Sequence, residues 1–393
     1  MINKQKLTIG LTVFVDVFGL GIIIPVLPIF LHDMIQSPFW IEMFFTIYAL
    51  CGFVAAPILG ALSDRFGRRP ILILSIAGTA IGWWIFSLGS SSIIFLVIGR
   101  IIDGITSGNI STAQSYLIDI SKDAKERTAN LGMIGAIFGI AFITGPAIGG
   151  LLSKISLMTP FFITSVLATI NAISAYFFLP ETNLNRDHSR KISFNPFKDM
   201  TSAFADTRIR LLLIVWGIYT LCFGLVQSVF SLYGHLAFDF SATTNGVLMA
   251  VSGLVIALNQ GFLLKKVWLK YFPEKLLSIG STIALGIAYL FMAVHSIFFL
   301  VIGLILSSFG QSLTRVLNNS AVSHLAPPHK VGQMMGVLQS IMFFTAILSP
   351  ILGGIALEYS LILPWFISAG LMLVAFVLLR IEYIQLKKAH MEI

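Results

Sequence analysis

Long apolar runs, separated by short polar breaks, constrain the fold of this chain more than any other feature. Twelve such runs occur between residues 5 and 386. Each is about as long as the roughly 20 residues that an α-helix needs to cross a bilayer. Charged residues make up only 11% of the 393 residues, compared with about a quarter in a soluble domain. The sequence therefore predicts an all-α membrane protein. It excludes a soluble enzyme, a fibrous protein, a disordered chain and an outer-membrane barrel, whose strands alternate over about ten residues.

The runs form two sets of six predicted transmembrane helices. The first set covers residues 5–31, 39–62, 70–89, 92–119, 128–152 and 159–179. The second set covers residues 210–235, 242–264, 274–295, 297–325, 331–357 and 360–386. A long polar stretch, residues 180–208, lies between the sets. We therefore expect an N-terminal six-helix bundle over residues 1–180, a cytoplasmic linker over 181–209 and a C-terminal six-helix bundle over 210–393.

Two short motifs repeat between the halves. GPAIGG at 145–150 is similar to SPILGG at 349–354, and FGL at 18–20 recurs at 223–225. Both pairs share an offset of about 205 residues, which favours duplication and two pseudo-symmetric bundles. Repeated bundles around a site at the membrane midplane are typical of secondary transporters.

The positions of Lys and Arg predict the orientation, because cytoplasmic loops carry an excess of these residues. With the N-terminus inside, all but three of the 25 Lys and Arg residues lie on the inner side. The exceptions are Lys154 in an outer loop and Arg100 and Arg315 within predicted helices. We expect a multi-pass protein of the bacterial inner membrane with both termini cytoplasmic. Because the topology accounts for the positions of the cations, we do not expect the net charge of +8 to indicate a nucleic-acid partner.

The energy source is predicted from what the sequence lacks. No Gly-Lys pair occurs, so the chain has no Walker loop for ATP. The histidines are scattered, and two isolated cysteines form neither a metal site nor a disulfide framework. We expect no cofactor, no metal and no catalytic residues, and therefore an ion gradient as the driving force. The expected partners are a small-molecule substrate and the lipid bilayer, with the chain as a monomer.

Charged side chains within the predicted helices are the first functional candidates, because each costs about 2.5–3.5 kcal/mol at a helix centre. Asp16 lies near the middle of the first helix, with no cation close in sequence. Arg100 and Asp103 are three residues apart and share a face of the fourth helix. They form either a structural ion pair or a pair in which the cation tunes proton affinity. Asp16 is the predicted proton carrier, with Arg100 and Asp103 as further proton-coupling candidates.

Polar stripes follow three of the predicted helices. Ser107, Ser111 and Gln114 continue the face of Arg100 and Asp103, and similar stripes occur on the seventh and tenth helices. Polar stripes facing lipid are costly, so we expect them to face protein or a water-filled cavity. Aromatic residues in such helices are more often packing or lipid contacts, but they also suit a flat amphipathic compound. The candidate substrate-lining residues are Ser107, Gln114, Trp216, Phe223, Gln227, Gln311, Arg315 and Asn318.

The segment GALSDRFGRRP, residues 60–70, places Asp64 among three arginines. A basic loop alone is an ordinary topology signal, but this pattern resembles the signature between the second and third spans of the major facilitator superfamily. DVFGLGIIIPVLP at 16–28 resembles the first span of bacterial drug:proton antiporters, particularly tetracycline efflux pumps. RIIDGITSGNIS at 100–111 resembles the fourth-span motif, and GMIGAIFGIAFITGPAIGG at 132–150 the fifth-span antiporter motif. The resemblance covers essentially the whole chain and implies the major facilitator fold.

The resemblance also implies roles for matched residues. Asp64 would meet the start of the eleventh helix near Val331, where a helix dipole favours negative charge. Arg65 or Arg69 would pair with Asp119 to latch the cytoplasmic side. The implied cytoplasmic gate comprises Gly60, Asp64, Arg65, Gly67, Arg68, Arg69 and Asp119. Asp16 and Arg100 match positions linked to proton coupling. The glycines and proline that would bend and pack the fifth helix are Gly135, Gly139, Gly145, Pro146, Gly149 and Gly150.

Three departures from the family pattern bear on the function. Ala141 occupies a position where the antiporter motif has glycine, Asp103 is unusual in tetracycline pumps, and the second-half copy of the loop signature, residues 261–275, is degraded. We expect proton-coupled antiport that exports a lipophilic or amphipathic molecule by alternating access. The alternatives are a proton-linked importer or an exporter of one metabolite or siderophore, and a polytopic enzyme or sensor.

Overall fold

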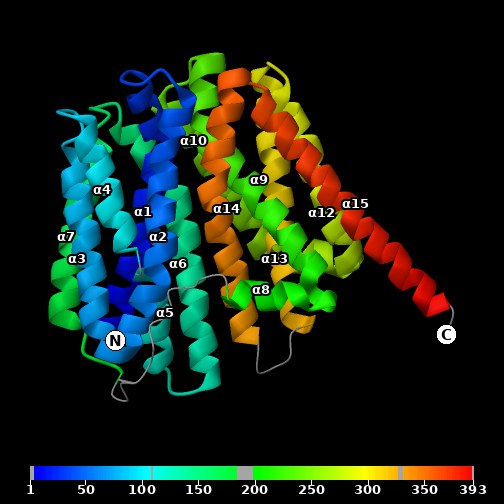
Figure 1. Ribbon diagram of the computed structural model, residues 1–393, viewed down its shortest axis with the longest axis horizontal. Coiled ribbons are helices and arrows are strands. Elements are labelled where there is room, and N and C mark those ends of the chain that lie inside the picture. The colour runs from blue at the N-terminus through cyan, green and yellow to red at the C-terminus, as the bar shows by residue number, and fades with distance from the viewer. Residues whose placement is uncertain (1–3, 108, 184–197, 326–330, 392–393) are drawn as a thin grey trace. The chain divides into compact units, whose positions relative to one another are not determined.

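An apolar segment inside a bilayer folds as a helix because a helix satisfies its own backbone hydrogen bonds. The computed structural model describes residues 4–107, 109–183, 198–325 and 331–391 (Figure 1). Every regular element in these ranges is a helix, which confirms the prediction of an all-α protein. Packing divides the chain into two compact units.

The first unit comprises Met1–Gln36, Met43–Pro196 and Ser241–Ala250. Its helices are α1 (Lys4–His32), α2 (Pro38–Phe66), α3 (Arg68–Ser87), α4 (Ile93–Ile105), α5 (Asn109–Asp119), α6 (Ala124–Leu152) and α7 (Thr159–Phe178). Within this unit α1 packs on α6 and α7, and α3 packs on α4 and α7 (Figure 1).

The second unit comprises Ser37–Glu42, Phe197–Phe240 and Val251–Ile393. Its helices are α8 (Lys198–Ala205), α9 (Thr207–Phe238), α10 (Ala242–Leu258), the π-helix η1 (Asn259–Trp268), α11 (Leu269–Tyr271), α12 (Glu274–Ala293), α13 (Ile297–Leu325), α14 (Val331–Tyr359) and α15 (Leu363–Met391). Here α9 packs on α14 and α15, and α12 packs on α13 and α15.

Two helices contribute residues to both units. The first turn of α2, Ser37–Glu42, is grouped with the second unit, whereas the rest of α2 belongs to the first. Conversely, Ser241–Ala250 of α10 is grouped with the first unit. The sequence, read as two consecutive bundles, did not anticipate this exchange of two short segments.

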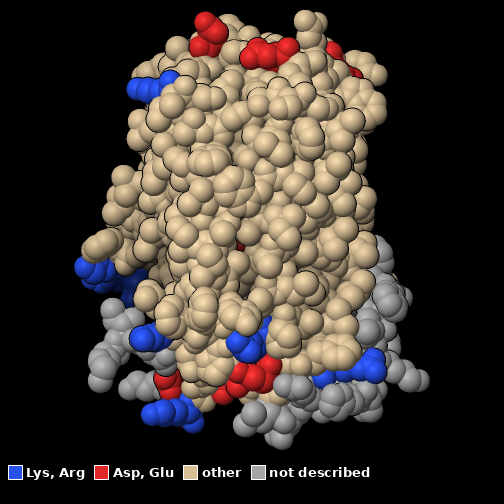
Figure 2. Space-filling model, turned by 90° about the vertical axis from the view of Figure 1, so that its left-hand side faces the viewer, with Lys and Arg blue, Asp and Glu red and all other residues tan. Residues whose placement is uncertain are grey.

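Eleven helices in the described residues are long and apolar enough to cross a membrane. The fourth predicted helix, 92–119, differs from the prediction because it is divided into α4 and α5, of 13 and 11 residues. The predicted eighth helix, 242–264, continues through η1 to Tyr271, and α8 lies within the predicted linker. On the face shown in Figure 2, Lys, Arg, Asp and Glu cluster at two ends with an uncharged band between them.

Candidate functional site

The break in the fourth predicted helix provides the polar centre of the first unit. Helix α4 ends at Ile105, and the Thr106 hydroxyl donates back to the carbonyl oxygens of Ile102 at 2.8 Å and Asp103 at 3.3 Å. Helix α5 begins at Asn109, whose side chain is fully buried. An interrupted helix at membrane depth is tolerated only where protein or a water-filled cavity surrounds it.

Asn109 connects the start of α5 to α1 and α3. Its Nδ2 donates to Oδ1 of Asp16 at 3.0 Å and to the hydroxyl oxygen of Thr79 at 3.2 Å. The amide oxygen of Asn109 is buried and has no hydrogen-bond partner among the described residues. The predicted proton carrier, Asp16, therefore lies in a small polar network inside an apolar bundle.

Asn109 lies in the fourth-span motif but is not among the site residues predicted from the sequence. A stripe drawn at spacings of three to four residues from Asp103 reaches Ser107 and Ser111, because it assumes one continuous helix. In the structure α4 ends at Ile105 and a separate helix, α5, begins at Asn109, so a stripe extrapolated along α4 does not continue into α5. An asparagine directly after Ser-Gly in an apolar run was the available signal, because these residues interrupt helices.

Arg100 and Asp103 form the predicted pair on α4. Arg100 Nη2 lies 3.3 Å from Asp103 Oδ2, and the two side chains are 2% and 7% exposed. Three aromatic rings surround the guanidinium, with centroids 4.5 Å away for Phe86, 4.7 Å for Trp83 and 5.5 Å for Tyr48. Such cation–π contacts partly replace the water that the cation loses. The structure thus contains the ion pair, and its functional role stays a prediction.

At the other end of α5, Asp119 forms an ion pair with an arginine, as expected for the cytoplasmic gate, but the arginine is not one of the two predicted. Arg68 Nε lies 3.1 Å from Asp119 Oδ2, so the pairing expected for Arg65 or Arg69 is wrong. Arg69, one residue later and thus rotated around α3, donates to the carbonyl oxygen of Tyr176 at 2.9 Å. Arg65 lies over the Phe66 ring. The side chains of Asp64 and Val331 lie outside the described residues.

Glu181 contacts the predicted gate, although the sequence places this residue in the predicted linker. Its carboxylate accepts hydrogen bonds from the backbone N–H groups of Arg68 at 2.8 Å and Arg69 at 3.3 Å, the first residues of α3. A negative charge at a helix N-terminus is favourable. Gly67 has φ of 111°, and a Cβ there would overlap the Glu181 carboxylate. This contact explains why residue 67, the second glycine position of the loop signature, has no side chain. At Gly60, the first position, no atom lies within 4 Å of an added Cβ.

Three of the predicted glycines of α6 are positions of close helix packing. A Cβ on Gly145 would lie 3.0 Å from the Gly21 Cα, and one on Gly149 would lie 3.0 Å from the Ile22 Cα, both on α1. The Gly150 carbonyl oxygen accepts from the Thr243 hydroxyl at 2.6 Å. The other predicted α6 positions differ: Gly135 and Gly139 have open space around an added Cβ, and Pro146 lies inside the helix.

The predicted substrate-lining residues have varied surroundings. Trp216 of α9 is buried and donates to the Leu338 carbonyl oxygen at 2.8 Å, and Phe223 stacks on Tyr219 at a centroid distance of 6.3 Å. Gln311 and Asn318 on α13 are buried, whereas Arg315 is exposed. Three others are partly buried: Ser107, Gln114 and Gln227. Their role in binding substrate stays a prediction, and the side chain of Ser111 lies outside the described residues.

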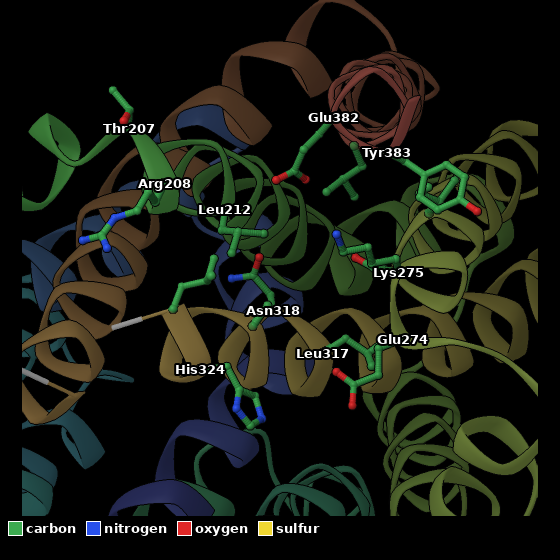
Figure 3. Close-up of a pocket in the computed structure, with 15 residues that line it drawn as sticks. Thr207, Arg208, Leu212, Glu274, Lys275, Leu317, Asn318, His324, Glu382 and Tyr383 are labelled. Carbon is green, nitrogen blue, oxygen red and sulfur yellow. The ribbon is translucent and has the colours of Figure 1, made fainter. Parts of the chain in front are cut away.

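Asn318 also lines a cavity of about 620 Å³ within the second unit (Figure 3). Helices α9, α12, α13 and α15 form its walls, and their apolar side chains alternate with charged ones that include Arg208, Lys275 and Glu382. Figure 3 shows the Asn318 amide pointing towards the same space as the Glu382 and Lys275 side chains. Asn318 Nδ2 is buried without a hydrogen-bond partner in the described part of the chain. No group of three His, Cys, Asp or Glu that could hold a metal occurs among the described residues.

Comparisons with known proteins agree with this geometry. A family model described as Major Facilitator Superfamily matches residues 9–280 and 266–389. The chain is 31% identical over 387 residues to Tetracycline resistance protein, class C, of Escherichia coli, covering 96% of this chain and 97% of that protein. It is 27% identical over 385 residues to Multidrug resistance protein 2 of Bacillus subtilis, covering 95% and 94% of the two chains.

Two solved structures have the same fold. The human organic anion transporter MFSD10 (TETRAN) aligns with a TM-score of 0.72 and 22% identity. The nucleoside transporter NupG aligns with a TM-score of 0.77 and 14% identity. Each alignment covers 96% of this chain and 99% of the other.

Proposed function

Because the chain belongs to the major facilitator superfamily, we propose that this multi-pass membrane transporter exports an amphipathic small molecule in exchange for protons, by alternating access. The observation that carries the proposal is the hydrogen bond from Asn109 to Asp16 at the break between α4 and α5. Full-length relatives that are tetracycline resistance proteins support a drug as cargo. The same relatives do not favour an importer or an exporter of one metabolite or siderophore.

The amide of Asn109 suits both protonation states of Asp16. An ionised carboxylate accepts the Nδ2 hydrogen bond at 3.0 Å, which stabilises its charge. A protonated Asp16 carboxyl has an O–H group that can donate a hydrogen bond. The Asn109 Oδ1 atom, which has no partner among the described residues, can accept it. Acid and amide then form two hydrogen bonds, with Thr79 holding the amide in place. The network therefore supports binding and release of a proton without rebuilding the bundle.

The proposal includes the surroundings of the transporter. Protons are the coupling ion, no cofactor is required, and the chain works as a monomer in a bacterial inner membrane with both termini cytoplasmic. The distribution of Lys and Arg supports this orientation. The substrate contacts polar and aromatic side chains of the candidate lining set, and Arg68, Asp119 and Glu181 tie the cytoplasmic ends of α3, α5 and α7 together.

Everted membrane vesicles with an acidic lumen test the proposal, with tetracycline as the probe. Wild-type vesicles should accumulate tetracycline, and its addition should make the lumen less acidic. Asp16→Asn should abolish both signals, because asparagine cannot exchange a proton. Asp33→Asn is the matched control, since Asp33 is an exposed carboxylate in the turn before α2. Wild-type vesicles that neither accumulate tetracycline nor release protons would refute tetracycline export, and full coupling in Asp16→Asn would refute the proton carrier.

A further inference from the structure

Glu42, in the first turn of α2, is a buried carboxyl that the sequence analysis did not identify. Its side chain is 0% exposed. Neither carboxyl oxygen has a hydrogen-bond partner among the described residues. The ion pairs of the described chain join other residues. Among the described residues, Glu42 is therefore an acidic group with no ion-pair partner, inside a segment that is long and apolar enough to span a membrane.

Helix α14 approaches this turn of α2 closely because it has a glycine there. An added Cβ on Gly354 would lie 2.7 Å from the Phe39 Cα and 3.2 Å from the Glu42 Cβ. Ser228 of α9 is the polar group beside the carboxyl, but its hydroxyl donates to the Leu225 carbonyl oxygen at 3.1 Å. The Gly354 backbone of α14 and the Ser228 side chain of α9 thus lie beside Glu42.

Two other titratable groups on these helices have contacts of their own. On α14, Glu358 lies one turn after Gly354, is exposed, and accepts a hydrogen bond from Ser37. On α9, His235 lies two turns after Ser228, and its Nδ1 contacts the Phe240 carbonyl oxygen at 3.2 Å. An isolated carboxylate is so costly to bury that the group takes up a proton instead. Packing of this turn therefore requires the neutral acid.

We propose that Glu42 is a second proton-binding site of the transporter, protonated while the first turn of α2 packs on α14 and ionised when that turn becomes exposed. The claim that the Glu42 proton is transported rests on the proposed function. The claim that Glu42 is protonated in the packed state does not. The turn Ser37–Glu42 belongs to the second unit and Met43 onward to the first. Because one helix carries both segments, loss of the proton from Glu42 can be linked to movement of α2.

Infrared spectroscopy of purified protein tests the protonation without any substrate. A protonated carboxyl has a C=O stretch that ionised carboxylates lack and that shifts in deuterium oxide. We use an Asp16→Asn background, so that Asp16 does not contribute. At neutral pH this protein should keep a protonated-carboxyl band. Adding Glu42→Gln should reduce the intensity of this band, because the part due to Glu42 is lost. Adding Asp33→Asn instead should leave the band unchanged.

The outcomes distinguish this site from the proposed function. A band missing from the Asp16→Asn protein, or one whose intensity Glu42→Gln leaves unchanged, would overturn the protonated state of Glu42. The band of the Asp16→Asn protein is measured without any change at Glu42, so this test remains available even if Glu42→Gln does not fold. In tetracycline-loaded vesicles, Glu42→Gln should reduce the number of protons exchanged per tetracycline, and an unchanged ratio would overturn the transport role. If wild-type vesicles transport no tetracycline, proton release from Glu42 is instead measured on raising the pH, as loss of the part of the band that Glu42→Gln removes. If this part persists up to unfolding, release of the proton from Glu42 is overturned.

Discussion

At the residue scale, one amide organises the polar centre of the first unit. Asn109 reaches Asp16 on α1 and Thr79 on α3 from the first position of α5. Asn109 is the residue at which α5 begins after the break, and its amide is the hydrogen-bond partner of Asp16.

Asn109→Ala should impair proton coupling more than any change at Thr79. A hydrogen bond to a charged group contributes about 1.5–3 kcal/mol, so coupled tetracycline uptake should fall by roughly tenfold or more. Thr79→Val removes only a neutral partner, worth about 0.5–1.5 kcal/mol, and should reduce uptake far less. The measurement is the initial rate of uptake in everted vesicles at matched protein levels. Equal rates for Asn109→Ala and wild type would contradict the role given to this amide.

The two glycines of the loop signature should respond differently to alanine. Gly67→Ala should destabilise the protein by about 1–3 kcal/mol, because a side chain is strained at this positive φ and overlaps the Glu181 carboxylate. Gly60→Ala should be neutral or stabilising by up to about 1 kcal/mol, since it lies in helix α2 with free space around it. Thermal unfolding in detergent compares the two variants. Equal losses of stability would show that the Glu181 contact does not constrain Gly67.

At the element scale, α1 and α6 are joined by close packing along their lengths and by polar side chains at their starts. Glycines bring α6 against α1 along their lengths. At their starts, Lys6 Nζ donates to Glu126 Oε1 at 2.8 Å, and the Lys122 backbone N–H donates to Glu126 Oε2 at 3.0 Å. The hydrogen bond from Lys6, followed by that from Lys122, holds the pKa of Glu126 below its usual value of 4.5.

The link between the starts of α1 and α6 should weaken in acid. A lowered folded-state pKa means that the stabilisation is complete above the unfolded value and is lost as the pH falls through the folded value. Amide hydrogen exchange in the first turn of α6 should therefore quicken, after correction for intrinsic rates, as the pH drops below 4.5. Glu126→Gln should show the faster exchange already at neutral pH. Exchange that does not differ between wild type and Glu126→Gln would rule out this link.

At the scale of the whole molecule, the bias of Lys and Arg predicts one orientation in the membrane. A C-terminal fluorescent-protein fusion should fluoresce, and a C-terminal alkaline phosphatase fusion should be inactive, because the first folds in the cytoplasm and the second outside it. A cysteine at Lys154, in a chain from which Cys51 and Cys222 have been removed, should react with an impermeant reagent in intact cells. Phosphatase activity at the C-terminus would contradict the orientation.

Much of the fold was predictable because a segment that crosses lipid must be a helix of about 20 mainly apolar residues, and such segments can be found directly in the sequence. The predicted second helix, 39–62, corresponds to α2 at Pro38–Phe66, and its start is correct within one residue. Charged residues within the predicted helices identified Asp16 and the Arg100–Asp103 pair, and the family resemblance implied Asp119 as a partner of an arginine. Helix breaks and partner choice were harder: residues 92–119 are apolar enough to suggest one helix, and three nearby arginines are equivalent in a linear sequence.

The sequence by itself determined that this chain is a helical membrane transporter of the major facilitator superfamily, because apolar length, charge bias and motif order are all read along one dimension. Tertiary structure decided that Arg68 is the partner of Asp119, that Glu181 caps α3, that Asn109 holds Asp16 and that Glu42 is buried without a partner. The physical reason is that hydrogen bonds and burial depend on distances of a few ångströms between segments that can lie more than a hundred residues apart.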